Sequence, residues 1–287
     1  MPAVIDIPSG PTIESDLTAV AFGNQPGRWP LPSAHTPRQL WLRAVGAGGQ
    51  GRYASARDDL AALLSSAPAG ALASLAHSTQ ASFLRQLGWH QLARGWDGRA
   101  MALAGADPEA AADALIGLAA DALGVGRLAA SATLLSRAEP LVAEAQQHRL
   151  SVRRAWVSAE LAMAAGDGAA AVRNAEAAVE LAATSVDGSA EEPGHPQVSA
   201  RHCAKSDVVL AAALCSAGAV DRARTVGEET LELTGRLGLV PLRWAVACLL
   251  VDLVDTGSLT RPITGLCDIR DECARQVQHW GGAWARR

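Results

Sequence analysis

One glycine-rich stretch has the spacing of a nucleotide-binding loop. Residues Gly46–Gly51 read GAGGQG, a formal G-x-G-x-x-G that follows an apolar run and precedes a helix-forming stretch. In a dinucleotide-binding fold such glycines let the backbone approach a pyrophosphate. That fold needs a second parallel strand after the helix, whereas this chain continues with SSAPAGALASLAHSTQASFL, which reads as another helix. A nucleotide-binding enzyme is therefore the least favoured of the functions considered.

Residues that could bind a metal form no recognisable motif. Two sets of candidate ligands stand close in the sequence: Cys267, Cys273 and His279, and His195, His202 and Cys203. The first set recurs every six residues, which does not stack the side chains on one helix face, and no CxxC occurs. The second set flanks a loop and would meet a metal only by chance. No GxSxG, HExxH or P-loop is present. We expect no cofactor, no metal and no enzymatic activity.

The composition favours an all-α protein. Of the 287 residues 49% are hydrophobic, mostly Ala and Leu, while aromatic residues make up 4%. Ala and Leu are the best helix formers, and the strand formers Phe and Tyr are scarce. The 25 basic and 29 acidic residues give a net charge of −4 without a block of like charge. Nucleic acid is not an expected partner of such a chain.

The sequence predicts a cytoplasmic protein that has no membrane partner. The N-terminus lacks the basic start and apolar run of a signal peptide. The longest apolar stretch, Trp244–Val254, is too short to span a bilayer. Five scattered cysteines, an odd number, indicate free and mostly buried thiols.

Residues 1–36 are rich in Pro and Gly and are expected to form an extended or disordered N-terminal arm. Six prolines fall in this segment, and each removes a backbone donor and disfavours helix at the preceding residue. Two interpretations stay open: an unstructured tail, or an arm that lies across the rest of the protein with Phe22 or Trp29 in an apolar slot.

From Pro37 onward a helix-turn-helix unit recurs. Each of five copies ends a first helix near a glycine and has a small residue five positions later: Gly51 and Ala56, Gly88 and Ala93, Gly126 and Ser131, Gly166 and Ala171, Gly218 and Ala223. A weaker sixth copy begins at Gly257. Seven residues before each of the first five glycines stands an alanine: Ala44, Ala81, Ala119, Ala159 and Ala211. Facing small residues let two helices approach closely, and glycine permits the left-handed turn between them.

This pattern resembles the tetratricopeptide repeat family. Leu210-Ala211-x-x-Leu214 with Gly218 and Ala223 matches its motif, as does Gly51-x-Tyr53-x-x-Ala56 with the closing Pro68. The spacing of about 38 exceeds the usual 34 or so, and the signature Trp is displaced, so the chain looks like the divergent long-repeat type of bacterial regulators. The resemblance implies that residues 37–287 form a right-handed α-solenoid of about five to six repeats.

Two departures from the regular period are interpreted separately. Residues 184–199, which carry two prolines and two glycines, are expected to form a flexible insertion. Beyond Thr260 an apolar face predicts a last helix that caps the stack, with Gly281 and Gly282 ending it.

In the family, the first helices line a concave groove that binds extended or helical peptides. Registering each unit on its glycine places the candidate groove residues mainly ten and thirteen positions earlier. They are Arg38, Trp41, Ser78, Arg85, Asp113, Ile116, Arg153, Trp156, Glu160, Lys205, Val208 and Trp244. Trp suits an aromatic anchor and Arg suits a carboxylate, although these Trp could instead pack as core between units. The Lys and Asn set with which some members clamp a C-terminal carboxylate is missing.

The leading hypothesis is a non-enzymatic scaffold or adaptor that binds a peptide or protein segment in this groove. The alternative is a regulatory sensor that binds a small molecule or signal peptide there. A homodimer is possible in either case, because apolar solenoid ends or an exchanged arm could join two copies.

Overall fold

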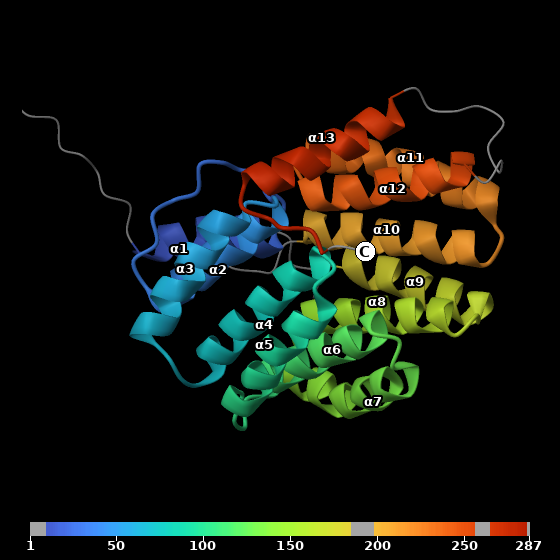
Figure 1. Cartoon of the computed structure of the whole chain (residues 1–287). Coiled ribbons are helices and arrows are strands. Elements are labelled where there is room, and N and C mark those ends of the chain that lie inside the picture. The colour runs from blue at the N-terminus through green and yellow to red at the C-terminus, as the bar shows by residue number, and fades with distance from the viewer. Residues whose placement is uncertain (1–9, 185–197, 256–264, 286–287) are drawn as a thin grey trace, which may run out of the picture.

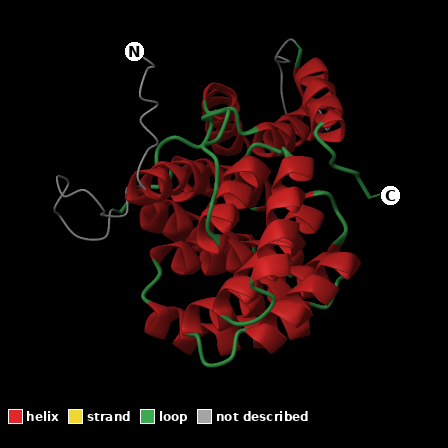
Figure 2. Ribbon diagram, turned by 90° about the vertical axis from the view of Figure 1, so that its left-hand side faces the viewer, coloured by secondary structure: helices red, strands yellow, loops and turns green. Residues whose placement is uncertain are grey.

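The computed structural model describes residues 10–184, 198–255 and 265–285, and within these ranges it contains helices and loops but no strand (Figures 1 and 2). The all-α prediction is confirmed for this part of the chain. The helices are α1 (Gly10–Phe22), α2 (Pro37–Gly49), α3 (Tyr53–Ser66), α4 (Ala71–Gln86), α5 (His90–Leu103), α6 (Pro108–Gly124), α7 (Leu128–Ala145), α8 (His148–Ala164), α9 (Gly168–Ala183), α10 (Ala200–Ser216), α11 (Val220–Arg236), α12 (Val240–Asp255) and α13 (Leu266–His279).

From α2 onward, consecutive helices pack in pairs. Each of α2, α4, α6, α8, α10 and α12 packs against the helix that follows it and also contacts the first helix of the neighbouring pair. Figure 1 shows the pairs following one another along the chain, from α2 and α3 through α6 and α7 to α12 and α13. This succession places the first helices side by side, so residues far apart in the sequence share one face.

The predicted turn glycines and small residues have the expected roles. Gly51, Gly88, Gly126, Gly166 and Gly218 all have φ between +76° and +87°, the left-handed conformation that ends the first helix of a pair. The ten small residues at the two registered positions are all 0% exposed: Ala44, Ala56, Ala81, Ala93, Ala119, Ser131, Ala159, Ala171, Ala211 and Ala223. The helices of a pair therefore meet at positions where neither has a large side chain.

The proline content predicts an extended or disordered arm over residues 1–36, but α1 occupies Gly10–Phe22 of it. The only proline in this helix, Pro11, lies in the first turn, where no intrahelical donor is needed. Ile13, Leu17, Val20 and Ala21 form a buried stripe with helical spacing. The prolines predict an extended chain, whereas the apolar spacing favours a helix, so the prediction is wrong for residues 10–22.

Residues 23–36 contain no helix and lie against the first helical pair. The side-chain amide of Gln50 donates to the carbonyl oxygens of Pro26, at 2.9 Å, and Arg28, at 3.0 Å. The guanidinium carbon of Arg52 lies 3.9 Å from the centroid of the Trp29 ring. Trp29 is 42% exposed and does not fill an apolar slot, whereas Phe22, at the end of α1, packs against the core.

The glycine-rich stretch lies within α2 and at its end, and its glycines are sites of close packing. A Cβ added to Gly46 would lie 2.7 Å from Cγ1 of Val20, and one added to Gly48 would collide with the Phe83 ring. One added to Gly49 would lie 2.9 Å from Cδ of Arg201. These glycines admit side chains from α1, α4 and α10, rather than forming a loop between a strand and a helix.

The first and last parts of the chain are in contact. The backbone N–H of Ala54, in α3, donates to the carbonyl oxygen of Trp280 at 2.9 Å. The N–H of Ala285 donates to the carbonyl oxygen of Leu87, after α4, at 2.8 Å. The segment after α13 therefore lies along the first two helical pairs (Figure 1).

The predicted last helix is confirmed as α13, with Leu266, Cys273 and Val277 buried. The prediction for the insertion and the weak sixth turn at Gly257 fall largely or wholly outside the described residues. The five cysteines form no disulfide, as predicted. Cys273 is buried, three are half-buried and Cys267 is exposed, so fewer thiols are fully buried than the sequence predicts. No helix in the described ranges is long and apolar enough to cross a membrane.

Candidate binding cavity

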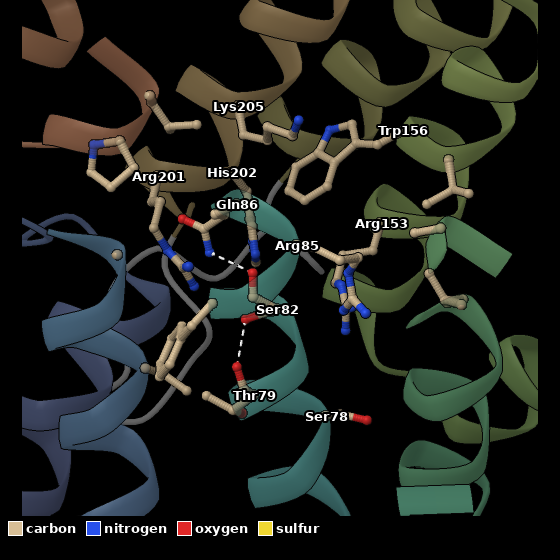
Figure 3. Close-up of a pocket in the computed structure, with 18 of the residues that line it drawn as sticks. Ser78, Thr79, Ser82, Arg85, Gln86, Arg153, Trp156, Arg201, His202 and Lys205 are labelled. Atoms are coloured by element: carbon tan, nitrogen blue, oxygen red, sulfur yellow. Dashed lines mark hydrogen bonds between the residues drawn. The ribbon is translucent and has the colours of Figure 1, made fainter. Parts of the chain in front are cut away.

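The first helices of the pairs surround a cavity of about 400 Å³. Its lining side chains come from α1, α2, α4, α6, α8, α10 and α12, together with His90 at the start of α5. Figure 3 shows side chains from α4, α8 and α10 directed into the same space. The volume is within the range of small-molecule and cofactor pockets, about 300–1,000 Å³.

Ten of the twelve predicted groove residues line this cavity. They are Trp41, Ser78, Arg85, Asp113, Ile116, Arg153, Trp156, Glu160, Lys205 and Trp244. Seven of them stand ten or thirteen positions before a turn glycine, about three helical turns earlier, and the turn glycine sets the register that directs them inward. Arg85 and Glu160 lie nearer to their turns, and the turn glycine assigned to Trp244, Gly257, lies outside the described residues. Positions counted from the turn glycines therefore predict residues that share one surface of the folded protein.

The other two predicted residues lie elsewhere. Nε of Arg38 is 2.7 Å from a carboxylate oxygen of Glu14, in α1, and this ion pair lies on the surface. Val208 is buried in an apolar cluster that includes Leu231 and Leu250, of α11 and α12. Arg38 is held outside the cavity by α1, a helix that the sequence did not predict, and Val208 faces the neighbouring pair.

Arg85 bridges two buried acids behind the cavity wall. Its guanidinium forms an ion pair with Asp97, and Nη1 lies 3.0 Å from a carboxylate oxygen of Asp121. Ser78 donates to the other oxygen of Asp97 at 3.0 Å. Burial, reinforced by the charge of Asp121, raises the pKa of Asp97 to about 7 although Arg85 opposes the rise. Burial also raises the pKa of Asp121. Arg85 is thus paired with two neighbouring carboxylates through Nη1.

A second cluster joins α6 and α8. Nη2 of Arg149 lies 2.7 Å from Glu109, and its Nη1 lies 3.3 Å from Asp113. Arg153 forms an ion pair with the same Asp113. Burial, and then the charge of Arg85, lowers the pKa of Arg153 to about 10. A single carboxylate thus serves two guanidinium groups on this wall.

Arg201, on the first turn of α10, has a different environment. Its Nη2 donates to the carbonyl oxygen of Ala21 at 3.1 Å, and its buried Nε has no hydrogen-bond partner. None of the ion pairs among the described residues includes it. Burial, and then the charge of Arg149, lowers its pKa to about 10, so it remains a cation at neutral pH.

Aromatic rings form another part of the wall. The Phe22 ring centroid lies 5.5 Å from that of Trp41 and 6.2 Å from that of His202, and the Trp156 centroid lies 5.4 Å from that of His202. Burial, followed by the charges of nearby arginines, lowers the pKa of His202 well below its ordinary value. The histidine is therefore neutral at pH 7 and acts as an uncharged ring.

The two predicted Trp anchors are fixed by hydrogen bonds. The indole N–H of Trp41 donates to Oγ1 of Thr79 at 3.0 Å, and that of Trp156 donates to Oγ of Ser206 at 2.8 Å. Nζ of Lys205, in α10, lies 3.2 Å from a carboxylate oxygen of Glu160, in α8. Trp41 is also part of the core beside α1, so the two interpretations of this residue, cavity wall and core, both apply.

Several cavity residues were not predicted from the sequence. Phe22 comes from α1, and Arg149, Arg201 and His202 were not in the predicted set. Arg201 precedes the predicted Lys205 by one helical turn, so extending the same helix face would have found it. The described residues contain no group of His, Cys, Asp or Glu side chains that could hold a metal, and His195 lies outside them.

Comparisons with known proteins give no assignment. No family model matches the sequence, and no curated protein matches it. The resemblance to tetratricopeptide repeats therefore stays a prediction based on the recurring turn glycines and small residues.

Proposed function

We propose that this protein is a non-enzymatic regulatory module that binds a small ligand in the cavity between its helical pairs. The observation that carries this proposal is a half-open cavity of about 400 Å³ lined by residues of eight helices, with charged and aromatic side chains on its wall. In this proposal the helical pairs are tetratricopeptide-like repeats of a right-handed solenoid, and occupancy of the cavity changes how closely neighbouring pairs pack.

The contacts between the two ends of the chain favour a small ligand over an extended one. An extended protein segment needs a groove that is open along its length. Here the segment after α13 bonds to the start of α3 and to the loop after α4, and its Trp284 packs on Trp244 of the cavity wall. The cavity is therefore flanked by this segment on one side. A small molecule or the end of a peptide fits such a space better than a continuous segment.

A peptide or protein segment is the second candidate. The observation that favours it is that Trp41 and Trp156, at equivalent positions of two units, both line the cavity. Rigid aromatic side chains of this kind anchor peptide side chains in other interfaces. A peptide end that inserts between them would make the protein an adaptor, as the repeat resemblance implies.

The test is a thermal-shift screen of the full chain with a panel of metabolites and short peptides. A ligand at 100 times its dissociation constant adds about 2.7 kcal/mol to the free energy of unfolding. The blocking variant is Ala120→Trp, because Ala120 lines the cavity. The matched control is Leu92→Trp, since Leu92 is 55% exposed.

A stabilising compound that acts on the wild type and on Leu92→Trp, but not on Ala120→Trp, supports the proposal. A compound that stabilises all three proteins binds outside the cavity and contradicts it. If only peptides stabilise the wild type, the adaptor function is favoured instead.

A further inference from the structure

Of the positively charged side chains on the cavity wall, all but one are paired with a carboxylate. Five cationic side chains line the cavity: Arg85, Arg149, Arg153, Arg201 and Lys205. Four of them form ion pairs with carboxylates of α5, α6 or α8. Arg201 takes part in none of the ion pairs found among the described residues. Its side chain donates instead to the neutral carbonyl oxygen of Ala21.

The position of Arg201 is fixed by its neighbours. Its side chain passes over Gly49 so closely that a Cβ there would lie 2.9 Å from its Cδ and 3.4 Å from its Nε. Arg201 is half-buried and its Nε is buried without a hydrogen-bond partner. A charge held partly out of water without a counter-ion is unfavourable, and an anion beside it would offset this cost. Figure 3 shows Arg201 and Arg153 on opposite sides of the cavity, with His202 and Gln86 between them.

The surroundings of Arg201 cannot supply the missing negative charge. His202 is neutral and lies next to it in α10. Arg149 and Arg153 are paired with two carboxylates, those of Glu109 and Asp113, and the positive charge of Arg149 acts on Arg201. The three arginines therefore exceed the two carboxylates by one charge. This part of the cavity therefore has an excess of positive charge that a ligand can neutralise.

The rings beside Arg201 indicate the rest of the ligand. The His202 ring centroid lies 6.2 Å from that of Phe22 and 5.4 Å from that of Trp156. These three rings line the same cavity as Arg201. Flat aromatic or apolar groups pack well on such a wall. One uncompensated cation matches one negative charge, and a guanidinium binds a carboxylate with two parallel hydrogen bonds.

We propose that the cavity binds a small organic monoanion, a carboxylate with an aromatic or apolar body, and that Arg201 binds its carboxylate. This inference rests on the proposed function and specifies the chemical class of its ligand. Arg153, on the opposite wall, favours the same charge, and the rings of Phe22, Trp156 and His202 contact the body.

The experiment compares two probes that differ only in charge, N-acetylphenylalanine and N-acetylphenylalaninamide, by isothermal titration calorimetry with the full chain. We expect the acid to bind about tenfold more tightly than the amide or better, as a hydrogen-bonded charge pair implies. In Arg201→Gln the acid is expected to lose this advantage while the amide binds as before. Arg222→Gln is the control, because Arg222 is exposed and paired with Glu176 on the outer helices.

A second variant tests the same site without removal of the charge. Gly49→Ala displaces Arg201, because the added methyl group collides with its side chain. It is expected to weaken binding of the acid but not of the amide, and it remains informative if Arg201→Gln fails to fold. A third arm uses N-acetyl-Ala-Ala-Phe with a free or an amidated C-terminus, to separate a small carboxylate from a peptide end.

The outcomes distinguish this inference from the proposed function. If acid and amide bind equally to the wild type and neither binds to Ala120→Trp, the cavity binds ligands but the preference for an anion is refuted. If neither probe binds to the wild type, the anion site is refuted, and the compound panel decides on the proposed function separately. Tighter binding of the acid that persists in both Arg201→Gln and Gly49→Ala refutes the role of Arg201.

Discussion

The ring centroid of Trp244, in α12, lies 4.2 Å from that of Trp284, in the segment that follows α13. Trp244 lines the cavity, and the same segment donates and accepts hydrogen bonds with residues around the turn between α4 and α5. The carbonyl oxygen of Ala283 accepts from the indole N–H of Trp89 at 2.6 Å. The C-terminal segment thus joins the last helical pair to the second one beside the cavity.

Replacement of Trp284 tests this connection. Trp284→Ala removes the ring contact with Trp244 and the packing of a half-buried indole. We expect a loss of about 1–3 kcal/mol in the free energy of unfolding, less than for a fully buried Trp. Chemical denaturation measures the loss, and hydrogen exchange at the turn between α4 and α5 should become faster. Unchanged exchange at this turn would show that the segment does not hold the two pairs together.

Arg52 makes a second connection between the ends of the chain. Its guanidinium carbon lies 3.9 Å from the Trp29 ring centroid and 4.0 Å from that of Trp280. We expect a double-mutant cycle of Arg52→Ala and Trp29→Ala to give a coupling of about 0.5–1 kcal/mol, the usual strength of a cation–π contact at a partly exposed site. Arg52→Lys should lose part of this coupling, because the flat guanidinium stacks better than an ammonium group. Strict additivity of the two single variants would contradict the interaction.

Local sequence was sufficient to predict the helical pairs and ten of the residues that line the cavity. A turn glycine fixes where a first helix ends, so it also fixes which residues three turns earlier face inward. This register placed Trp41 and Trp156 on one surface although 114 positions separate them in the sequence. Such information is available because neighbouring pairs pack in the same way along the chain.

The remaining cavity residues depend on contacts that the repeat does not contain. Phe22 belongs to α1, whose helical stripe was hidden among prolines, and it reaches the cavity only because α1 packs on α2 and α10. The unpaired state of Arg201 follows from the absence of a carboxylate near its side chain among the described residues, a property of the tertiary structure. The glycines of α2 were conspicuous in the sequence, but their role as sites of close packing required the positions of Val20 and Phe83.

Arg85 is expected to be the most important single residue for the stability of the cavity wall. Arg85→Ala leaves the buried carboxylates of Asp97 and Asp121 without a counter-ion, and breaking such a cluster costs about 3–5 kcal/mol. Without the arginine the folded-state pKa of Asp97 rises further above its ordinary value, so the folded variant holds a proton that the unfolded chain releases. The loss should therefore be larger at pH 8 than at pH 5. Urea denaturation at both pH values checks this.

The control for this experiment is Arg222→Ala, which removes an exposed ion pair with Glu176 and should change stability by less than about 1 kcal/mol. An equal loss at pH 5 and pH 8 in Arg85→Ala would mean that the buried carboxyls of the variant take up no more protons on folding than those of the wild type.

His202 provides a prediction with the opposite dependence on pH. Burial and the charges of Arg201, Arg149 and Arg153 lower its folded-state pKa well below the ordinary value of 6.5. Below pH 6.5 the unfolded chain binds a proton at this histidine and the folded chain does not, so stability is fully present above pH 6.5 and falls as the pH is lowered. While only the unfolded state is protonated, the slope from this group approaches about 1.4 kcal/mol per pH unit.

His202→Phe keeps a ring beside Trp156 but cannot titrate, so its free energy of unfolding should fall less than that of the wild type between pH 6.5 and pH 5. His279→Gln, at an exposed position, should retain the wild-type slope. Parallel curves for the wild type and His202→Phe would show that the folded protein protonates His202 as readily as the unfolded chain does, and that the cavity is less positive than its arginines imply.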